Sequence, residues 1–225
     1  MRNQMAELSW NPGDVPVSEQ FDDPYFSLEN GFEETRHVFL GGNDLPARFA
    51  PGFHIAELGF GTGLNFLTTV LEWQRAGRPG TLHFTSFEAF PMTPPEMARA
   101  LAAFPVLADL VPRLVAHWSA EGCCADIVPG VRLEVLIGDA QASLSDWDGK
   151  ADAWYLDGFS PAKNPDLWSP DLMRAVAGHT YPGGTFATYT AAGFVRRSLE
   201  SSGFDVVRSP GFGRKRHMSR GVLRP

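Results

Sequence analysis

The sequence Glu57-Leu58-Gly59-Phe60-Gly61-Thr62-Gly63 directly follows the apolar run Phe53 to Ala56 and precedes apolar residues at helical spacing. A short apolar run that ends in a carboxylate and a glycine-rich turn predicts a buried strand, a tight loop and a helix. In an open parallel sheet, loops at the carboxyl ends of the strands form the ligand-binding edge. We therefore expect an α/β fold with a ligand site at residues 57–63.

The spacing of the glycines excludes two common nucleotide-binding motifs. A dinucleotide fingerprint requires Gly-x-Gly-x-x-Gly/Ala, and Leu64 takes the last of these positions; a phosphate-binding Gly-Lys-Ser/Thr is also absent. An acidic residue two positions before three alternating glycines instead resembles the motif of class I S-adenosylmethionine-dependent methyltransferases. This resemblance implies a methyl-donor site formed by Gly59, Phe60, Gly61, Thr62 and Gly63.

Composition favours one globular protein without a redox or metal motif. The chain has 225 residues, of which 44% are hydrophobic, enough for one full core. Cys123 and Cys124 are adjacent and match neither a Cys-x-x-Cys pair nor a zinc-binding spacing, so we predict no metal. Residues 1–10 lack the apolar stretch of a secretion signal, and no run is long enough to span a bilayer. We expect a cytoplasmic protein without a membrane partner.

The charge distribution is uneven. A net charge of −7 has the wrong sign for a nucleic-acid binder unless cationic residues gather on one face. They gather near the C-terminus, where residues 196–225 contain eight lysines and arginines against two acidic residues, a local balance of +6. This pattern indicates either a nucleic-acid-binding face or a solvated strand-and-helix surface.

Predicted strands and helices alternate from residue 51 onward. Helical spacing predicts helices at 64–75, 96–104, 106–118 and 192–202, and strand patterns occupy 53–58, 81–87, 131–137, 151–156, 184–190, 204–208 and 217–223. We predict a Rossmann-like class I methyltransferase domain over 51–225, with a mostly parallel seven-stranded sheet and helices on both faces. A small β-rich extension, residues 1–50, packs on the sheet to give one globular unit. The segment 120–129 carries no assignment.

Acidic residues stand at the ends of four successive predicted strands, at Glu57, Glu88, Asp139 and Asp157. We predict that Glu57 takes the methionine amine of the donor, Glu88 the ribose hydroxyls and Asp139 the adenine amino group. A helix cap or a solvated strand end is the alternative for each acid alone. The glycines allow close backbone approach, and the helix that follows presents free amides to the donor carboxylate.

Asp157 opens the sequence Asp157-Gly158-Phe159-Ser160-Pro161, a variant of the Asp/Asn-Pro-Pro-Tyr/Phe motif of N-methyltransferases. In that motif, oxygen atoms hold the target nitrogen in line with the methyl group. An alkyl amine with a pKa of ~10.4 must expose its lone pair, so we predict that Asp157 is catalytic, accepting the proton and positioning the amine. An N-cap is the alternative. Phe159 is expected to stack on an acceptor base or to be a core residue.

Five ordered blocks together resemble one family. They are FDDPYFS (21–27), GFEETRHVFL (31–40), GFGTGLNFL (59–67), DGFSPAKNP (157–165) and GFGRKR (211–216), and the resemblance extends from about Trp10 to Leu223. The family is the methyltransferase component of the tRNA 5-methylaminomethyl-2-thiouridine biosynthesis protein. The resemblance implies methylation of the exocyclic amine of 5-aminomethyl-(2-thio)uridine at the tRNA wobble position, with S-adenosyl-L-methionine as the donor.

The same resemblance implies further site residues and partners. It places Tyr25 and Asn65 near the methyl donor, and it places Lys163, Asn164, Arg214, Lys215 and Arg216 against the tRNA anticodon stem-loop. In many members a flavin-dependent oxidase in the same chain prepares the amine; no such domain occurs in this sequence, so the expected partner is a separate or fused oxidase. Two alternatives are a class I methyltransferase that acts on a small-molecule or protein amine, and a binding module without chemistry.

Overall fold

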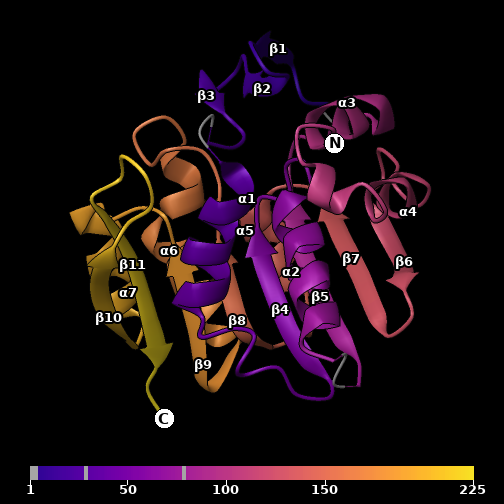
Figure 1. Ribbon diagram of the computed structural model, residues 1–225. Coiled ribbons are helices and arrows are strands. Elements are labelled where there is room, and N and C mark those ends of the chain that lie inside the picture. The colour runs from indigo at the N-terminus through magenta and orange to yellow at the C-terminus, as the bar shows by residue number, and fades with distance from the viewer. Residues whose placement is uncertain (1–4, 28–29, 78–79) are drawn as a thin grey trace.

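A mixed eight-stranded sheet forms the centre of the molecule (Figure 1). The computed structural model describes residues 5–27, 30–77 and 80–225. The strand order is β10 (Phe204–Pro210), β11 (His217–Leu223), β9 (Thr180–Thr188), β8 (Ala151–Leu156), β4 (Phe53–Leu58), β5 (Leu82–Glu88), β7 (Val131–Ile137) and β6 (Cys123–Val128). The five strands from β9 to β7 are parallel, whereas β6, β11 and β10 each pair antiparallel with a neighbour.

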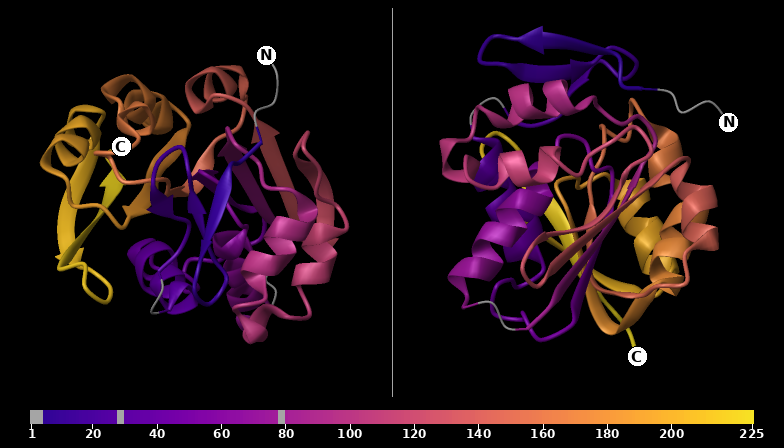
Figure 2. Two further views of the ribbon diagram at one scale, coloured as in Figure 1. Left: turned by 90° about the horizontal axis from the view of Figure 1, so that it is seen from above. Right: turned by 90° about the vertical axis from the view of Figure 1, so that its right-hand side faces the viewer.

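Helices cover both faces of this sheet (Figure 2). One layer contains α1 (Gly31–Thr35), the π-helix η1 (Arg36–Gly41), α2 (Leu64–Arg75), α3 (Pro94–Leu101), η2 (Pro105–Leu107) and α4 (Val111–Val115); the other contains α5 (Ala140–Asp146), η3 (Pro165–Trp168), α6 (Pro170–Gly178) and α7 (Gly193–Ser201). The side chains of successive strand residues point to opposite faces of the sheet. Ile55 and Tyr155 pack against the first helical layer, and Trp154 and Leu156 pack against the second. Both faces of the parallel strands are therefore buried, as their near-continuous apolar sequence indicates.

The predicted Rossmann-like α/β architecture is confirmed, with a corrected strand count. The sheet has eight strands rather than the predicted seven, because the unassigned segment 120–129 contains β6. This strand forms the edge of the sheet, where Cys124 is exposed, so its apolar pattern is weak. Gly130, with φ +80°, makes the turn into β7.

Two predicted helices are shorter than expected. The helix predicted at 96–104 begins two residues earlier and ends at Leu101, with Thr93 and Glu96 forming a capping box. The helix predicted at 106–118 is divided into η2 and α4, and Pro112 lies in the first turn of α4. Proline lacks the backbone N–H that a continuing helix requires, which explains the restart.

The N-terminal extension contains a small antiparallel sheet of β1 (Leu8–Asn11), β2 (Val15–Ser18) and β3 (Asp23–Pro24). Figure 1 shows this sheet above the carboxyl ends of β4 and β5. Residues 31–41 are helical instead and belong to the layer that covers the main sheet, where the ring of Phe39 lies 5.3 Å from that of Tyr155. The β-rich part of the extension therefore ends before α1.

Two properties of the described part of the chain bear on function. None of the helices within residues 5–27, 30–77 and 80–225 combines the length and apolar character needed to cross a bilayer. The same residues contain no cluster of three or more histidine, cysteine, aspartate or glutamate side chains arranged to hold a metal ion.

Candidate active site

A cavity of about 730 Å³ opens at the carboxyl ends of β4, β5, β7 and β8. Its volume falls in the range of roughly 300–1,000 Å³ that is typical of small-molecule sites. The walls come from the loops that follow these strands, from α1, and from the N-terminal segment around Tyr25. The cavity thus lies where an open α/β sheet is expected to bind its ligand.

The glycine loop presents bare backbone to this cavity. Gly59 has φ +83° and Gly61 has φ +55°, backbone conformations that residues with a Cβ atom rarely adopt. A Cβ atom at Gly59 would lie 3.1 Å from the carbonyl oxygen of Asp157, and one at Gly61 would lie 3.1 Å from the ring of Tyr25. Gly63 (φ +79°) is the N-cap of α2 and lies outside the cavity lining. Glycine at residues 59 and 61 therefore lets this turn, which lines the cavity, pack closely against Asp157 and Tyr25.

Asn65 connects two strand-end carboxylates. Its Nδ2 donates to Oε1 of Glu57 at 2.9 Å and to Oδ2 of Asp157 at 2.8 Å, and its Oδ1 accepts from the hydroxyl of Thr35 at 2.8 Å. The other oxygen of Glu57 accepts from Ser86 Oγ at 2.8 Å. Glu57 is fully buried beneath the cavity, and burial raises its pKa well above the usual value. In this structure Glu57 contacts Asn65 rather than the open space where a donor amine would lie.

Glu88 and Asp139 line the cavity and also hold its loops in place. Glu88 accepts from the backbone N–H of Gly61 and of Phe90, each at 2.8 Å, and burial raises its pKa. Asp139 is the N-cap of α5, with Oδ1 accepting from Ala142 N at 3.0 Å. Asp139 therefore has the helix-cap role that was its alternative, whereas Glu88 is buried and is neither a helix cap nor a solvated strand end.

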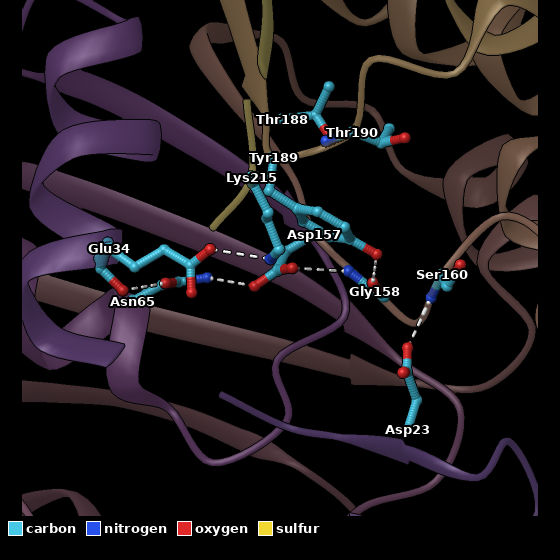
Figure 3. A network of polar contacts seen from close by, with 11 residues as sticks. Asp23, Glu34, Asn65, Asp157, Gly158, Ser160, Thr188, Tyr189, Thr190 and Lys215 are labelled. Atoms are coloured by element: carbon cyan, nitrogen blue, oxygen red, sulfur yellow. Dashed lines mark hydrogen bonds and ion pairs between the residues drawn. The ribbon is translucent and has the colours of Figure 1, made fainter. Parts of the chain in front are cut away.

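Asp157 is held in a fixed orientation at the edge of the cavity (Figure 3). Its Oδ1 accepts from the backbone N–H of Gly158 at 2.8 Å, while Oδ2 accepts from Asn65. Burial raises the pKa of Asp157 to about 6, against the opposing effects of these hydrogen bonds and of Lys215. The carboxylate is therefore mainly ionised at neutral pH and can accept a proton.

A lysine and two further side chains face Asp157 from other elements. Lys215 Nζ lies 2.8 Å from Oε1 of Glu34, on α1, and 4.0 Å from the ring centroid of Tyr189. The hydroxyl of Tyr189 donates to the carbonyl oxygen of Gly158 at 2.8 Å. We did not predict Glu34 and Tyr189 from the sequence. Glu34 lies within the second block of the family resemblance, and membership of this block was the one sequence feature that could have pointed to it.

Phe159 lies in an aromatic cluster with the N-terminal segment. Its ring stacks on Phe21 with centroids 4.8 Å apart and makes an edge contact with Tyr25 at 5.0 Å. Asp23 fixes the same segment by accepting from the backbone N–H of Ser160 at 2.8 Å. Residues 20–26 therefore form one wall of the cavity and are tied to the loop after β8.

Some of the predicted site residues line the cavity, and others lie outside it. Lys163 does not line the cavity; it donates to the backbone oxygen of Asp22 and lies 3.5 Å from Oδ1 of Asp23, so it ties the N-terminal segment to the loop after β8. Arg214 and Arg216 also lie outside the cavity lining, in the loop between β10 and β11. The predicted residues that line the cavity are Tyr25, Gly59, Phe60, Gly61, Thr62, Asn65, Glu88, Asp139, Asp157, Phe159, Asn164 and Lys215.

A model of an S-adenosyl-L-methionine-dependent methyltransferase family matches residues 105–224, more than half of the chain. The chain belongs to this family. The matched part contains Asp157 and the basic C-terminal residues, whereas the glycine loop lies before it. The methyl donor of this enzyme is S-adenosyl-L-methionine, and the cavity volume suits such a ligand.

Solved structures of other proteins share the fold of this enzyme. MnmC2 from Aquifex aeolicus superposes with a TM-score of 0.78 at 24% sequence identity, over 100% of this chain and 73% of that chain. TrmN from Thermus thermophilus gives a TM-score of 0.51 at 16% identity, over 93% and 55% of the two chains. The N-methyltransferase NodS from Bradyrhizobium japonicum WM9 gives 0.50 at 12% identity, over 88% and 99%. The likeness to MnmC2 includes the N-terminal extension.

Proposed function

We propose that this methyltransferase acts on the exocyclic amine of 5-aminomethyl-(2-thio)uridine at the tRNA wobble position and forms the 5-methylaminomethyl product. The observation that carries the proposal is the partly buried carboxylate of Asp157, fixed by Asn65 and Gly158 at the edge of the donor cavity. The five sequence blocks support the choice of acceptor, and the likeness to MnmC2, over 100% of this chain and 73% of that chain, supports the fold.

The donor lies against the glycine loop in this proposal. Its sulfonium supplies the methyl group to a nucleophile. The backbone of residues 59–63 and the N-terminus of α2 receive the methionine portion, and Glu88 and Asp139 bind the ribose and the adenine. Glu57 acts through Asn65, because both of its oxygens already accept hydrogen bonds beneath the cavity. Other donor-side contacts come from Tyr25, Phe60 and Thr62, which line the cavity.

Asp157 prepares the acceptor nitrogen. An alkyl amine is protonated near neutral pH and has no free lone pair until a base removes its proton. Asp157, with a pKa of about 6, accepts that proton, and the two hydrogen bonds that anchor its carboxylate keep this base in place beside the nitrogen. Positioning of this kind contributes up to about 7–11 kcal/mol of a reaction barrier. The neutral nitrogen then attacks the methyl group.

The proposed partner is the anticodon stem-loop of tRNA in the cytoplasm. Phe159 and Asn164 line the cavity mouth, and the basic loop with Arg214, Lys215 and Arg216 lies beside it, suited to phosphate contacts. Residues 1–50 and 51–225 work as one unit, because the N-terminal segment forms a wall of the site. A flavin-dependent oxidase, separate or fused, supplies the amine.

Nucleoside mass spectrometry tests this function. The protein is incubated with labelled S-adenosyl-L-methionine and tRNA that carries 5-aminomethyl-2-thiouridine, and the tRNA is then digested to nucleosides. We expect one labelled methyl group on the wobble nucleoside and none on tRNA whose wobble uridine is unmodified. A protein that binds the donor yet leaves the aminomethyl nucleoside unlabelled would contradict the proposal.

A further inference from the structure

The ammonium group of Lys215 lies in the same cavity as Asp157. Figure 3 shows it pointing toward Glu34 beside the Asp157 carboxylate. Lys215 belongs to the loop between β10 and β11, Glu34 to α1, and Tyr189 follows β9. Residues far apart in the sequence thus surround one alkylammonium group. The Glu34 side chain is 12% exposed, whereas that of Lys215 is 46% exposed.

The surroundings of this ammonium have the chemistry of a cation-binding site. Oε1 of Glu34 lies 2.8 Å from Lys215 Nζ and supplies a charged hydrogen bond, stronger than one between neutral groups. The ring face of Tyr189, with its centroid 4.0 Å away, attracts the same cation through its quadrupole. The Tyr189 ring is fixed because its hydroxyl donates to the carbonyl oxygen of Gly158, next to Asp157. An alkylammonium group is therefore recognised within the same cavity as the proposed base.

We propose that Glu34 and the ring of Tyr189 form the recognition site for the protonated acceptor amine, and that Lys215 occupies this site until the acceptor displaces it. The inference rests on the proposed function, because an aminomethyl group carries the same kind of cation as a lysine side chain. The incoming ammonium hydrogen-bonds to Glu34, and one proton then passes from its nitrogen to Asp157. The nitrogen keeps the electron pair with which it bonds to the methyl carbon, while the carbon–sulfur bond of the sulfonium breaks and the sulfur leaves with that bond's electron pair as a neutral thioether.

Exchange of one ammonium for another keeps the charge of the cavity unchanged. The Lys215 side chain can leave toward solvent, because nearly half of its surface is already exposed. Glu34 and Asp157 meanwhile retain one cationic partner, so neither of these partly buried carboxylates is left without a counter-charge.

Binding of two matched anticodon stem-loops tests the site. The loops differ only at the wobble base, which carries 5-aminomethyluridine in one and the neutral 5-hydroxymethyluridine in the other. Affinities are measured in the presence of S-adenosylhomocysteine, so that no methyl group is transferred. We expect wild-type protein to prefer the aminomethyl loop, and Glu34→Gln to reduce that preference roughly tenfold, as expected for loss of one hydrogen bond to a charged group.

Control variants separate recognition from a general effect on the protein. Glu33→Gln alters an exposed neighbour on α1 that pairs with Arg36, and the preference should remain as in wild type. Tyr189→Phe keeps the aromatic face and should keep most of the preference, whereas Tyr189→Leu should lose it. Unchanged donor binding by each variant shows that the fold is intact. An unaltered preference in Glu34→Gln would overturn the proposed site.

Lys215→Met tests the displacement. Removal of the competing ammonium should raise the preference for the aminomethyl loop; equal weakening of both loops would make Lys215 a phosphate ligand and overturn its place in the site. A parallel methyl-transfer assay with wild-type protein tests the proposed function separately from the recognition site. A methylated aminomethyl loop with an unchanged Glu34→Gln preference overturns this site alone, whereas an unmethylated loop overturns the proposed function and this site with it.

Discussion

Two carboxylates of the site depend on one amide. Both hydrogens of Asn65 Nδ2 are used, one toward Glu57 and one toward Asp157. Glu57 is fully buried and its other oxygen accepts from Ser86, so it fixes the rotation of Asn65, which in turn orients Asp157. A buried network in which every member has a partner is rigid, and rigidity is what a positioned base requires.

Replacement of this base separates chemistry from donor binding. We expect Asp157→Ala to lower turnover by about 10²–10⁴-fold, the usual contribution of a positioned acid or base. Affinity for S-adenosyl-L-methionine should stay measurable, because the glycine loop and Glu88 are retained. Calorimetric titration and a methyl-transfer assay on the same preparation check both points. Turnover equal to wild type would remove Asp157 from the catalytic role.

The pH dependence of the reaction should report the ionisation of Asp157. Burial raises its pKa to about 6, so the protonated, inactive form accumulates as the pH falls through that value. We therefore expect kcat/KM to decline below about pH 6 with the slope of a single proton. Lys215 lowers this pKa, and Lys215→Met should move the acid limb to higher pH. A flat profile through this range would contradict the assignment.

At the scale of elements, the turn between β4 and α2 needs glycine because its backbone φ is positive and because a Cβ atom would contact neighbouring residues. In Gly59→Ala the new Cβ would lie 3.1 Å from the carbonyl oxygen of Asp157, at a backbone φ of +83°. The turn that lines the donor cavity would have to shift, so we expect this variant to bind the donor more weakly. Gly77→Ala is a matched control, with φ +88° and open space around the Cβ. Both variants have a strained backbone, but calorimetry should show weaker donor binding in the first alone. Equal affinities would argue against a donor at this loop.

The parts of the structure that sequence could predict are those set by local pattern. The predicted bounds of β4 and α2 are confirmed, because apolar spacing and the flanking glycines define both ends. Strand β6 was missed since an edge strand shows a weak apolar pattern. Lys163 stays a predicted tRNA ligand, yet its contacts with Asp22 and Asp23 join segments about 140 residues apart, which no local pattern reveals.

At the scale of the whole molecule, an acidic protein gathers several of its cationic residues near one edge of the main sheet. Strands β10 and β11 and their connecting loop carry Arg208, Arg214, Lys215, Arg216 and Arg220. Some are already paired, as Arg220 is with Asp44 at 3.0 Å. A net charge of −7 repels RNA elsewhere, so binding should be confined to this edge and to the cavity mouth beside it.

The salt dependence of binding tests this arrangement. Affinity for the anticodon stem-loop should fall with rising salt, and Arg216→Ala should reduce the magnitude of the logarithmic slope by about 0.7 for one lost phosphate contact. Arg132→Ala is the control, because Arg132 lies on β7 near the opposite edge of the sheet, paired with Asp126. Salt-independent binding would favour a small-molecule or protein amine as the acceptor.

The central claim is that the donor loop and Asp157 meet at one acceptor nitrogen. A crystal structure with S-adenosylhomocysteine and an anticodon stem-loop that carries 5-aminomethyluridine tests it most directly. The account predicts that the donor sulfur lies beside residues 59–63 and that the wobble amine lies within hydrogen-bonding distance of Asp157, in line with the sulfur. An amine directed away from Asp157, or a donor bound outside the glycine loop, would contradict it.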